Sequence, residues 1–251
     1  MIATSVKAPL GAATARHRIA CVLFAAAGLC LMLTGCTVST IGRPAAAPDL
    51  GHWQPPPILS SRLGNLLLSE SDVNVVGGTT AMALRRPISE MSHSDGLGTN
   101  LNCLDAYSPI EAAVYQDSNW VAVQGQLLDN VHSRVDAHMH ALVQAVVGFR
   151  DADAAQQFFS RAEPRWSACA NRTLTITQPD QDPVSWALGE LVTSDTALTI
   201  MQTLDGVDGF ACQRAMGVRN NIIIDALWCG FDTTNQAGEV VTKIAAAVSQ
   251  A

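Results

Sequence analysis

Hydrophobic residues recur with two different spacings along the chain, and the spacing predicts where strands and helices lie. Segments 119–130 and 138–149 are rich in valine and leucine and predict two strands. Five more runs of strand character follow at 172–177, 184–192, 197–204, 210–217 and 221–229. Because the connections between most of these runs are short, we expect neighbouring strands to pair antiparallel.

Helical spacing is found between the second and third strand and again at the C-terminus. Segment 151–171 places apolar residues close to 3.6 positions apart, which predicts a helix. We expect Pro164 to split this segment into two helices, because proline cannot donate a backbone hydrogen bond. Segment 236–250 carries apolar residues on one helical face and predicts a final helix.

Shorter helices are predicted before the first strand. Segment 58–68 is a largely apolar stretch interrupted by Gly64, and 69–72 has the S-x-x-D signature of a capping box. Ser108 followed by Pro109 predicts another short helix that starts with proline. The expected fold class is α+β: a twisted antiparallel sheet with helices packed on one side, held by two disulfides.

The N-terminus has the features of an export signal. Three basic residues and no acidic residue precede an apolar run at 19–33, which is shorter than the roughly 20 residues of a membrane-spanning helix. The run ends at Leu33-Thr34-Gly35-Cys36, which resembles a bacterial lipobox, where the cysteine thiol receives a diacylglycerol. The alternatives are a signal peptide cleaved elsewhere and an uncleaved anchor. The expected organisation is therefore a lipoprotein signal peptide at 1–35, a proline-rich tether at 36–57 and one domain at 58–251.

Processing at Cys36 makes the chain more acidic. The discarded peptide holds Lys7, Arg16 and Arg18 and no acid, so Lys+Arg falls from 15 to 12 against 22 Asp+Glu. The mature net charge is then −10, with Lys243 as its one lysine. This balance argues against nucleic acid as a partner. We expect the membrane to be a partner only through the lipid on Cys36, which places the domain on the extracytoplasmic face of the cell membrane.

Four cysteines remain once the signal peptide and the lipidated residue are set aside: Cys103, Cys169, Cys212 and Cys229. An even number in an exported chain indicates two disulfides, and the spacing does not suggest a metal site. If Asn220-Asn221 forms a two-residue hairpin loop, counting outward places Cys212 opposite Cys229 on a non-hydrogen-bonded pair. By elimination Cys103 then pairs with Cys169.

Motifs for catalysis are not found. The chain lacks G-x-S-x-G, H-E-x-x-H, P-loop and dinucleotide-binding sequences, so we expect no catalytic residues, no cofactor and no metal. His138 and His140 share a face of a predicted strand, which is more typical of a polar sheet face than of a metal site. Arg214 and Asp225 lie on one face of the predicted hairpin and are interpreted as a structural ion pair.

Three segments together resemble the PknH-like extracellular sensor domain family. They are CLDAYSPIEAAVYQDSNWVAVQGQLL, VVGFRDADAAQQFFSRAEPRWSACANR and DGFACQRAMGVRNNIIIDALWCG, and the likeness extends over about 59–248. The resemblance implies an α+β domain with two disulfides, Cys103–Cys169 and Cys212–Cys229, and a cleft for a ligand that is not identified. It also implies a relation to the external part of a mycobacterial receptor kinase, although here a lipobox stands where the kinase has a transmembrane helix.

The expected function is a non-catalytic, sensor-like binding domain for a small molecule or cell-envelope ligand, with ligand-binding residues that the sequence does not identify. Two alternatives stay open at this point. One is a protein–protein interaction module at the cell envelope, which predicts an exposed apolar patch. The other, less favoured, is an envelope hydrolase, which predicts a nucleophile beside a base in a cleft.

Overall fold

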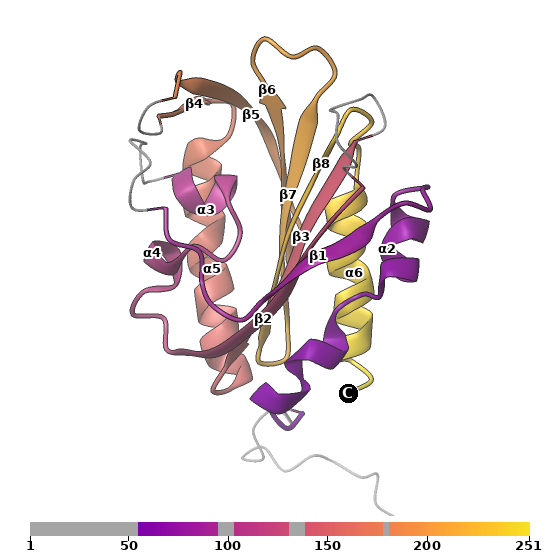
Figure 1. Cartoon of the computed structure of the whole chain (residues 1–251). Helices are drawn as coiled ribbons and strands as arrows, with labels where there is room; N and C mark the ends of the chain where they lie inside the picture. Colours follow the sequence, from indigo (N-terminus) through magenta and orange to yellow (C-terminus); the bar gives the residue numbers. More distant parts are fainter. Residues whose placement is uncertain (1–54, 95–102, 131–138, 178–180) are drawn as a thin grey trace, which may run out of the picture. The chain divides into compact units, whose positions relative to one another are not determined.

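A single antiparallel sheet of eight strands organises the domain (Figure 1). The computed structural model describes residues 55–94, 103–130, 139–177 and 181–251. The strand order is β1-β2-β3-β8-β7-β6-β5-β4, so the chain's last two strands lie at the centre. The strands are β1 (Ala83–Ile88), β2 (Trp120–Asp129), β3 (His140–Phe149), β4 (Thr173–Ile176), β5 (Val184–Thr193), β6 (Ala197–Leu204), β7 (Ala211–Arg219) and β8 (Ile222–Gly230).

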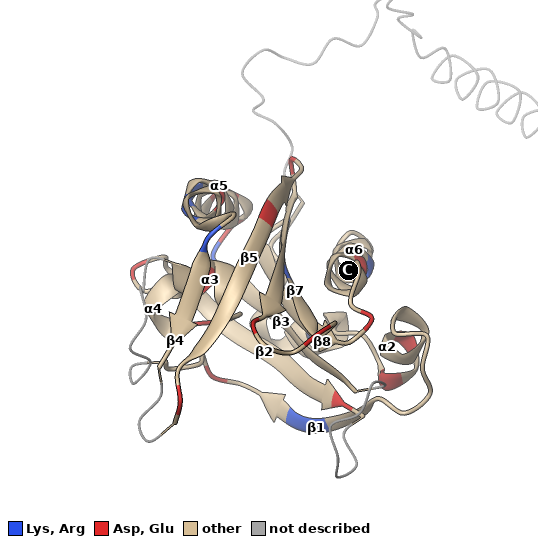
Figure 2. Cartoon of the chain, turned by 90° about the horizontal axis from the view of Figure 1, so that it is seen from above, with Lys and Arg blue, Asp and Glu red and all other residues tan. Residues whose placement is uncertain are grey.

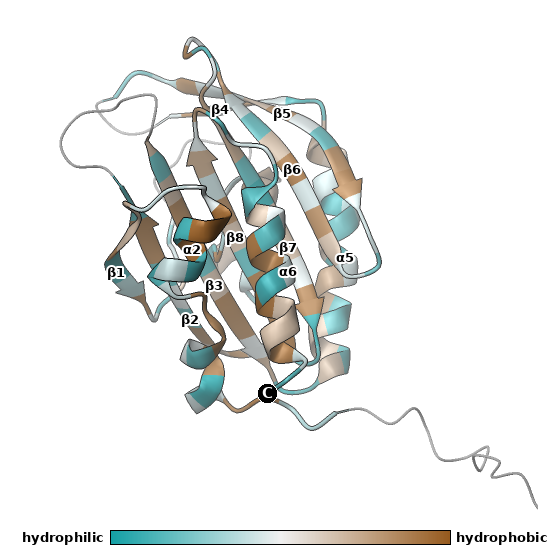
Figure 3. Cartoon of the chain, turned by 90° about the vertical axis from the view of Figure 1, so that its right-hand side faces the viewer, coloured by the Kyte–Doolittle hydropathy of each residue, from teal (hydrophilic) through white to brown (hydrophobic). Residues whose placement is uncertain are grey.

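Helices cover both faces of this sheet. One face carries α3 (Leu104–Tyr107), α4 (Ala112–Tyr115) and α5 (Ala152–Cys169). The other face carries the 3-10 helix η1 (Ser60–Leu66), α2 (Glu70–Val76) and α6 (Gln236–Val248). Seen from above, α5 and α6 lie on opposite sides of the strands (Figure 2), and Figure 3 looks onto the face that α2 and α6 cover. The α+β class and the antiparallel sheet are confirmed, but the expectation that helices pack on one side is wrong.

The central strands explain why the sheet needs two helical layers. Along β8, Ile222 and Ile224 face the layer of α6, whereas Ile223 between them faces the layer of α5. Because apolar side chains lie on both faces of β7 and β8, both faces must be covered to remove these side chains from water. Trp166 on α5 and Trp228 on β8 belong to the two separate cores and are fully buried.

The predicted hairpin between β7 and β8 is confirmed. Asn220 has a φ of 51°, the left-handed conformation that a two-residue loop requires and that asparagine tolerates. The register pairs Arg219 with Ile222 and, further along, Cys212 with Cys229. The two cysteines form a disulfide, as the hairpin register predicted. The two central strands of the sheet are therefore linked covalently.

Helix α5 is continuous, so the expectation that Pro164 splits it is wrong. Asp151 caps the start of α5 by accepting a hydrogen bond of 2.8 Å from the Ala154 N–H. Pro164 and Ser160, whose carbonyl loses its partner, both lie on the exposed side of the helix. Water can bind that carbonyl, and the buried side of α5 continues past the proline.

Other short elements agree with the predictions only in part. The capping box at Ser69 is present, with Asp72 as its second member, and α2 follows it. The segment before it forms a 3-10 helix instead of an α-helix, and strand β1 was not predicted. Ser108 ends α3 and does not begin a helix.

None of the helices among the described residues is long and apolar enough to cross a bilayer.

Candidate functional site

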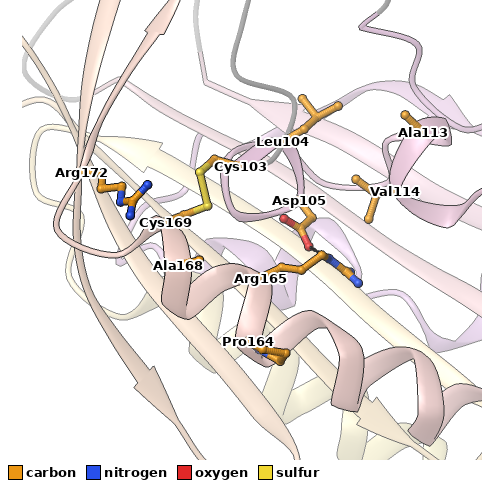
Figure 4. A pocket seen from close by; sticks show the side chains of 10 residues that line it. All are labelled: Cys103, Leu104, Asp105, Ala113, Val114, Pro164, Arg165, Ala168, Cys169 and Arg172. Carbon is orange, nitrogen blue, oxygen red and sulfur yellow. Dashed lines mark hydrogen bonds and ion pairs between the residues drawn. A yellow bond between two sulfur atoms is a disulfide. The ribbon is translucent and has the colours of Figure 1, made fainter.

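A groove lies between the α3–α4 segment, residues 103–116, and the C-terminal half of α5 (Figure 4). Its volume is about 710 Å³, within the range of small-molecule sites. The apolar part of its lining consists of Leu104, Ala113, Val114, Pro164 and Ala168. The remainder is polar or covalent: Asp105, Arg165, Arg172 and the Cys103–Cys169 disulfide. We refer to this feature as the α3–α5 groove.

Two links fasten α3 to α5 along this groove. The Cys103–Cys169 disulfide joins their ends, with Cα atoms 5.6 Å apart. Next to it, the Arg165 Nε donates a hydrogen bond of 2.7 Å to the Asp105 Oδ2, and the Asp105 side chain is almost completely buried. The Arg165 guanidinium also lies 5.9 Å from the centre of the Phe158 ring. These contacts hold the Arg165 side chain against α3 and fasten α3 to α5 on one side of the groove.

The α3–α4 segment is attached to the sheet by buried hydrogen bonds as well as by apolar packing. Asp225 Oδ2 accepts hydrogen bonds from the Ile110 N–H at 2.7 Å and from the Tyr115 hydroxyl at 3.0 Å. The Gln202 amide donates to the carbonyls of Ala106 and Tyr107, both at 2.9 Å. Because buried polar groups must find partners, these contacts specify where the segment sits more sharply than apolar packing alone.

Asp225 is balanced by Arg214, as the sequence predicted. The two side chains form an ion pair in the core, with 0% and 1% of their surfaces exposed. The Arg214 guanidinium also donates to the carbonyls of its own and the neighbouring strand and lies 5.0 Å from the centre of the Trp166 ring. Burial first, and the charge of Asp225 second, raise the pKa of Tyr115 well above its ordinary value of 10, so the hydroxyl stays protonated and donates. This cluster has a structural role, because it holds the α3–α4 segment, which forms one side of the groove, against the sheet.

Ile110 joins α3 to α4 in an unfavourable backbone conformation. Its φ is 51°, in the left-handed region that a β-branched residue rarely adopts. The hydrogen bond from its N–H to Asp225 and the burial of its side chain hold it there. Strained residues of this kind are concentrated at binding and switching sites, where surrounding contacts offset their cost.

The histidines do not form a metal site in the described structure. His140 is buried against Trp228 and lies 3.4 Å from the carboxylate of Asp232. It belongs to the face opposite the groove, and it is buried where an exposed polar face was expected. His138 lies outside the described residues, among which no group of three possible metal ligands was found. Cys36 and the signal peptide also lie outside them, so lipidation stays a prediction.

The polar residues of the groove were not identified from the sequence. Asp105 and Arg165 are 60 positions apart, and no local spacing connects them. The predicted Cys103–Cys169 disulfide contained the only usable signal, because it brings the residues flanking each cysteine together. The structure forms both predicted disulfides. Of the described residues that line the groove, none is a histidine, a serine or a free thiol.

Comparison with known proteins places the domain in a family. The model of the PknH-like extracellular domain matches residues 58–247. The serine/threonine-protein kinases PknH of Mycobacterium tuberculosis (strain H37Rv) and Mycobacterium bovis are each 34% identical over 192 residues. This match covers 76% of the chain but only 30% and 32% of the kinases, so the chain spans about a third of these relatives.

A solved structure shows the same fold. The crystal structure of the extracellular domain of PknH from Mycobacterium tuberculosis superimposes with a TM-score of 0.74 at 32% identity. The alignment covers 78% of this chain and 99% of that one, so an extracellular domain of this type forms its fold without the kinase part. On the family match, the identity to the two kinases and the shared fold, the chain belongs to the PknH-like extracellular domain family.

Proposed function

We propose that this chain is a lipid-anchored, non-catalytic sensor-like domain whose α3–α5 groove binds a small molecule or a cell-envelope component outside the cytoplasm. The observation that carries the proposal is the groove itself. Its lining is apolar with a few polar groups, which is the composition of a small-molecule site. The Cys103–Cys169 disulfide fastens its two sides together. The PknH-like extracellular domain family supplies the sensor context and the extracytoplasmic location.

A binding role fits the groove better than catalysis. Its described lining lacks the pair of nucleophile and base that acyl or phosphoryl transfer requires. Asp105, the one carboxylate among the described lining residues, accepts hydrogen bonds from Arg165 and from the Ala106 N–H, which give it a structural role. These contacts disfavour the envelope hydrolase considered from the sequence.

Anchoring through Cys36 is supported by the lipobox and by the composition of the tether. Residues 36–57 include Pro44, Pro48 and the triplet 55–57, which favour an extended backbone. Such a composition is typical of a spacer between a lipid anchor and a folded domain.

A second candidate function is protein–protein interaction. Trp120 and Val121 at the start of β2 expose large apolar side chains. A smaller depression lined in part by Trp120 and Met91 lies beside them and shares Ala113 with the α3–α5 groove. Exposed apolar side chains at a sheet edge are a feature of interaction sites.

Filling the groove should abolish ligand stabilisation. We expect a fraction of cell-envelope extract to raise the melting temperature of the wild-type domain by about 5–10 °C at saturation, because a ligand that binds only the folded state stabilises it. Ala168→Trp, at an exposed groove position on α5, should remove this rise. Ala81→Trp is the matched control, since it makes the same change at an exposed position away from the groove. An equal rise in both variants would contradict binding in the groove.

A further inference from the structure

The described residues that line the α3–α5 groove carry a net positive charge, although the whole chain has a net charge of −7. They include two arginines and one aspartate. The carboxylate of Asp105 is already neutralised, because it accepts from the Arg165 Nε and from the Ala106 N–H. Among these described lining residues, the positive charge of Arg172 is therefore left without compensation.

Arg172 follows α5 and comes directly before β4. Its side chain is exposed, and it makes no ion pair or side-chain hydrogen bond anywhere in the described structure. Figure 4 shows its guanidinium beside the Cys103–Cys169 disulfide, with Arg165 on the other side of that disulfide. An arginine with free donors at the end of an apolar groove provides a fork that matches the oxygens of a carboxylate or phosphate.

Arg165 provides a second, fixed donor. Its Nε is bound to Asp105 and its guanidinium lies over Phe158, so the group is held in place before any ligand arrives. Its Nη2 is buried and is not reached from the groove. The Arg165 side chain is nevertheless 38% exposed, so a ligand in the groove can contact the exposed part of it.

We infer that the α3–α5 groove recognises small molecules that carry a carboxylate or phosphate group next to an apolar portion, with Arg172 as the residue that binds the anionic group. The inference rests on the proposed binding function and adds a ligand class to it. The apolar portion lies against Leu104, Val114 and Ala168, and Arg165 contributes the exposed part of its side chain beside the anionic group. The volume of about 710 Å³ limits the ligand to small molecules.

Three probes of equal chain length test this inference: hexanoate, hexyl phosphate and the uncharged hexanamide. The protein is the chain from residue 53 onward, which forms one compact unit and corresponds to the solved extracellular domain. Binding is followed by NMR from the Nε–H signal of Arg172 and the backbone amides of Val114 and Ala168. We expect saturable shifts with the two anions and at least tenfold weaker binding of hexanamide. Comparing the anions shows whether carboxylate or phosphate is preferred.

Two variants with the same charge change separate recognition from general attraction. Arg172→Gln should weaken binding of both anions about tenfold and leave the fold intact, since this side chain has no partner to lose. Arg161→Gln, on the exposed side of α5 and outside the groove, should leave binding unchanged. Raising the salt concentration should weaken binding of the anions and leave hexanamide unaffected.

Three outcomes would overturn the inference. Equal binding of hexanamide, insensitive to Arg172→Gln, would show a groove that selects apolar ligands only, and the proposed binding function would survive. Equal effects of the two variants would show unspecific attraction to arginines. No shift at the groove with any probe would remove the assigned ligand class, while the comparison of Ala168→Trp with Ala81→Trp still decides independently whether the groove binds a ligand.

Discussion

Replacing Asp225 with alanine is expected to lower the free energy of unfolding by about 3–5 kcal/mol, the largest effect of any single substitution considered. The change leaves the charge of Arg214 buried without a counterion. It also removes the acceptor of the Ile110 N–H and of the Tyr115 hydroxyl, so the α3–α4 segment loses two of its hydrogen bonds to the sheet. Urea denaturation followed by tryptophan fluorescence measures the difference.

Two further variants keep this prediction testable if the alanine variant does not fold. Asp225→Asn retains an acceptor for Ile110 and Tyr115 but removes the charge, and it should cost less than the alanine. Asp195→Ala, at an exposed turn position, is the matched control and should stay within about 0.5 kcal/mol of wild type. Similar costs for Asp195→Ala and Asp225→Ala would show that the buried ion pair is not a main support of the fold.

Removing the Cys103–Cys169 disulfide is expected to cost about 4 kcal/mol and to impair the groove. The bridge closes a loop of 66 residues, and in the chain-entropy model longer loops contribute more stability. Because the bridge fastens α3 to α5, the double serine variant should also bind hexanoate more weakly. Thermal unfolding and the NMR titration measure the two effects separately.

The second disulfide provides an internal comparison. Cys212–Cys229 closes a loop of 17 residues between paired strands, and its removal should cost about 3 kcal/mol. It lies in the β7–β8 hairpin and not in the groove, so binding of the probe should stay at the wild-type level. Equal loss of binding in both double variants would argue that the effect comes from general destabilisation.

The β7–β8 hairpin could be predicted from the sequence because its register depends on local rules. A two-residue asparagine turn fixes which residues face each other, and the pairing of Cys212 with Cys229 follows by counting. The ion pair of Arg214 and Asp225 follows from the same register. Each of these predictions required only the order of residues on two neighbouring strands.

The covering of the sheet could not be predicted in the same way. Gln213 and Arg214 are adjacent on β7, so their side chains point to opposite faces of the sheet, and both are buried. Gln213 bonds Asn235 and Gly238 at the start of α6, and Arg214 bonds Asp225. Because the sequence pattern does not show that such polar side chains find buried partners, one helical layer was expected where the protein has two.

The groove escaped prediction for a related reason. Ser108, Pro109 and Glu111 suggested the start of a helix, and the Ser108 hydroxyl does donate to Glu111 at 2.6 Å. The backbone nevertheless turns at Ile110, because its N–H binds Asp225 on a strand 115 residues away. This long-range contact overrides the local preference and creates the α3–α4 connection along the groove.

Intact mass spectrometry of the protein extracted from membranes tests most directly the central claim that this is a lipid-anchored domain of the oxidising extracytoplasmic space. The account predicts a chain that begins at Cys36, carries acyl groups there, and has the mass of two disulfides among its four remaining cysteines. A chain with an unacylated start elsewhere, or with four free thiols, would contradict it.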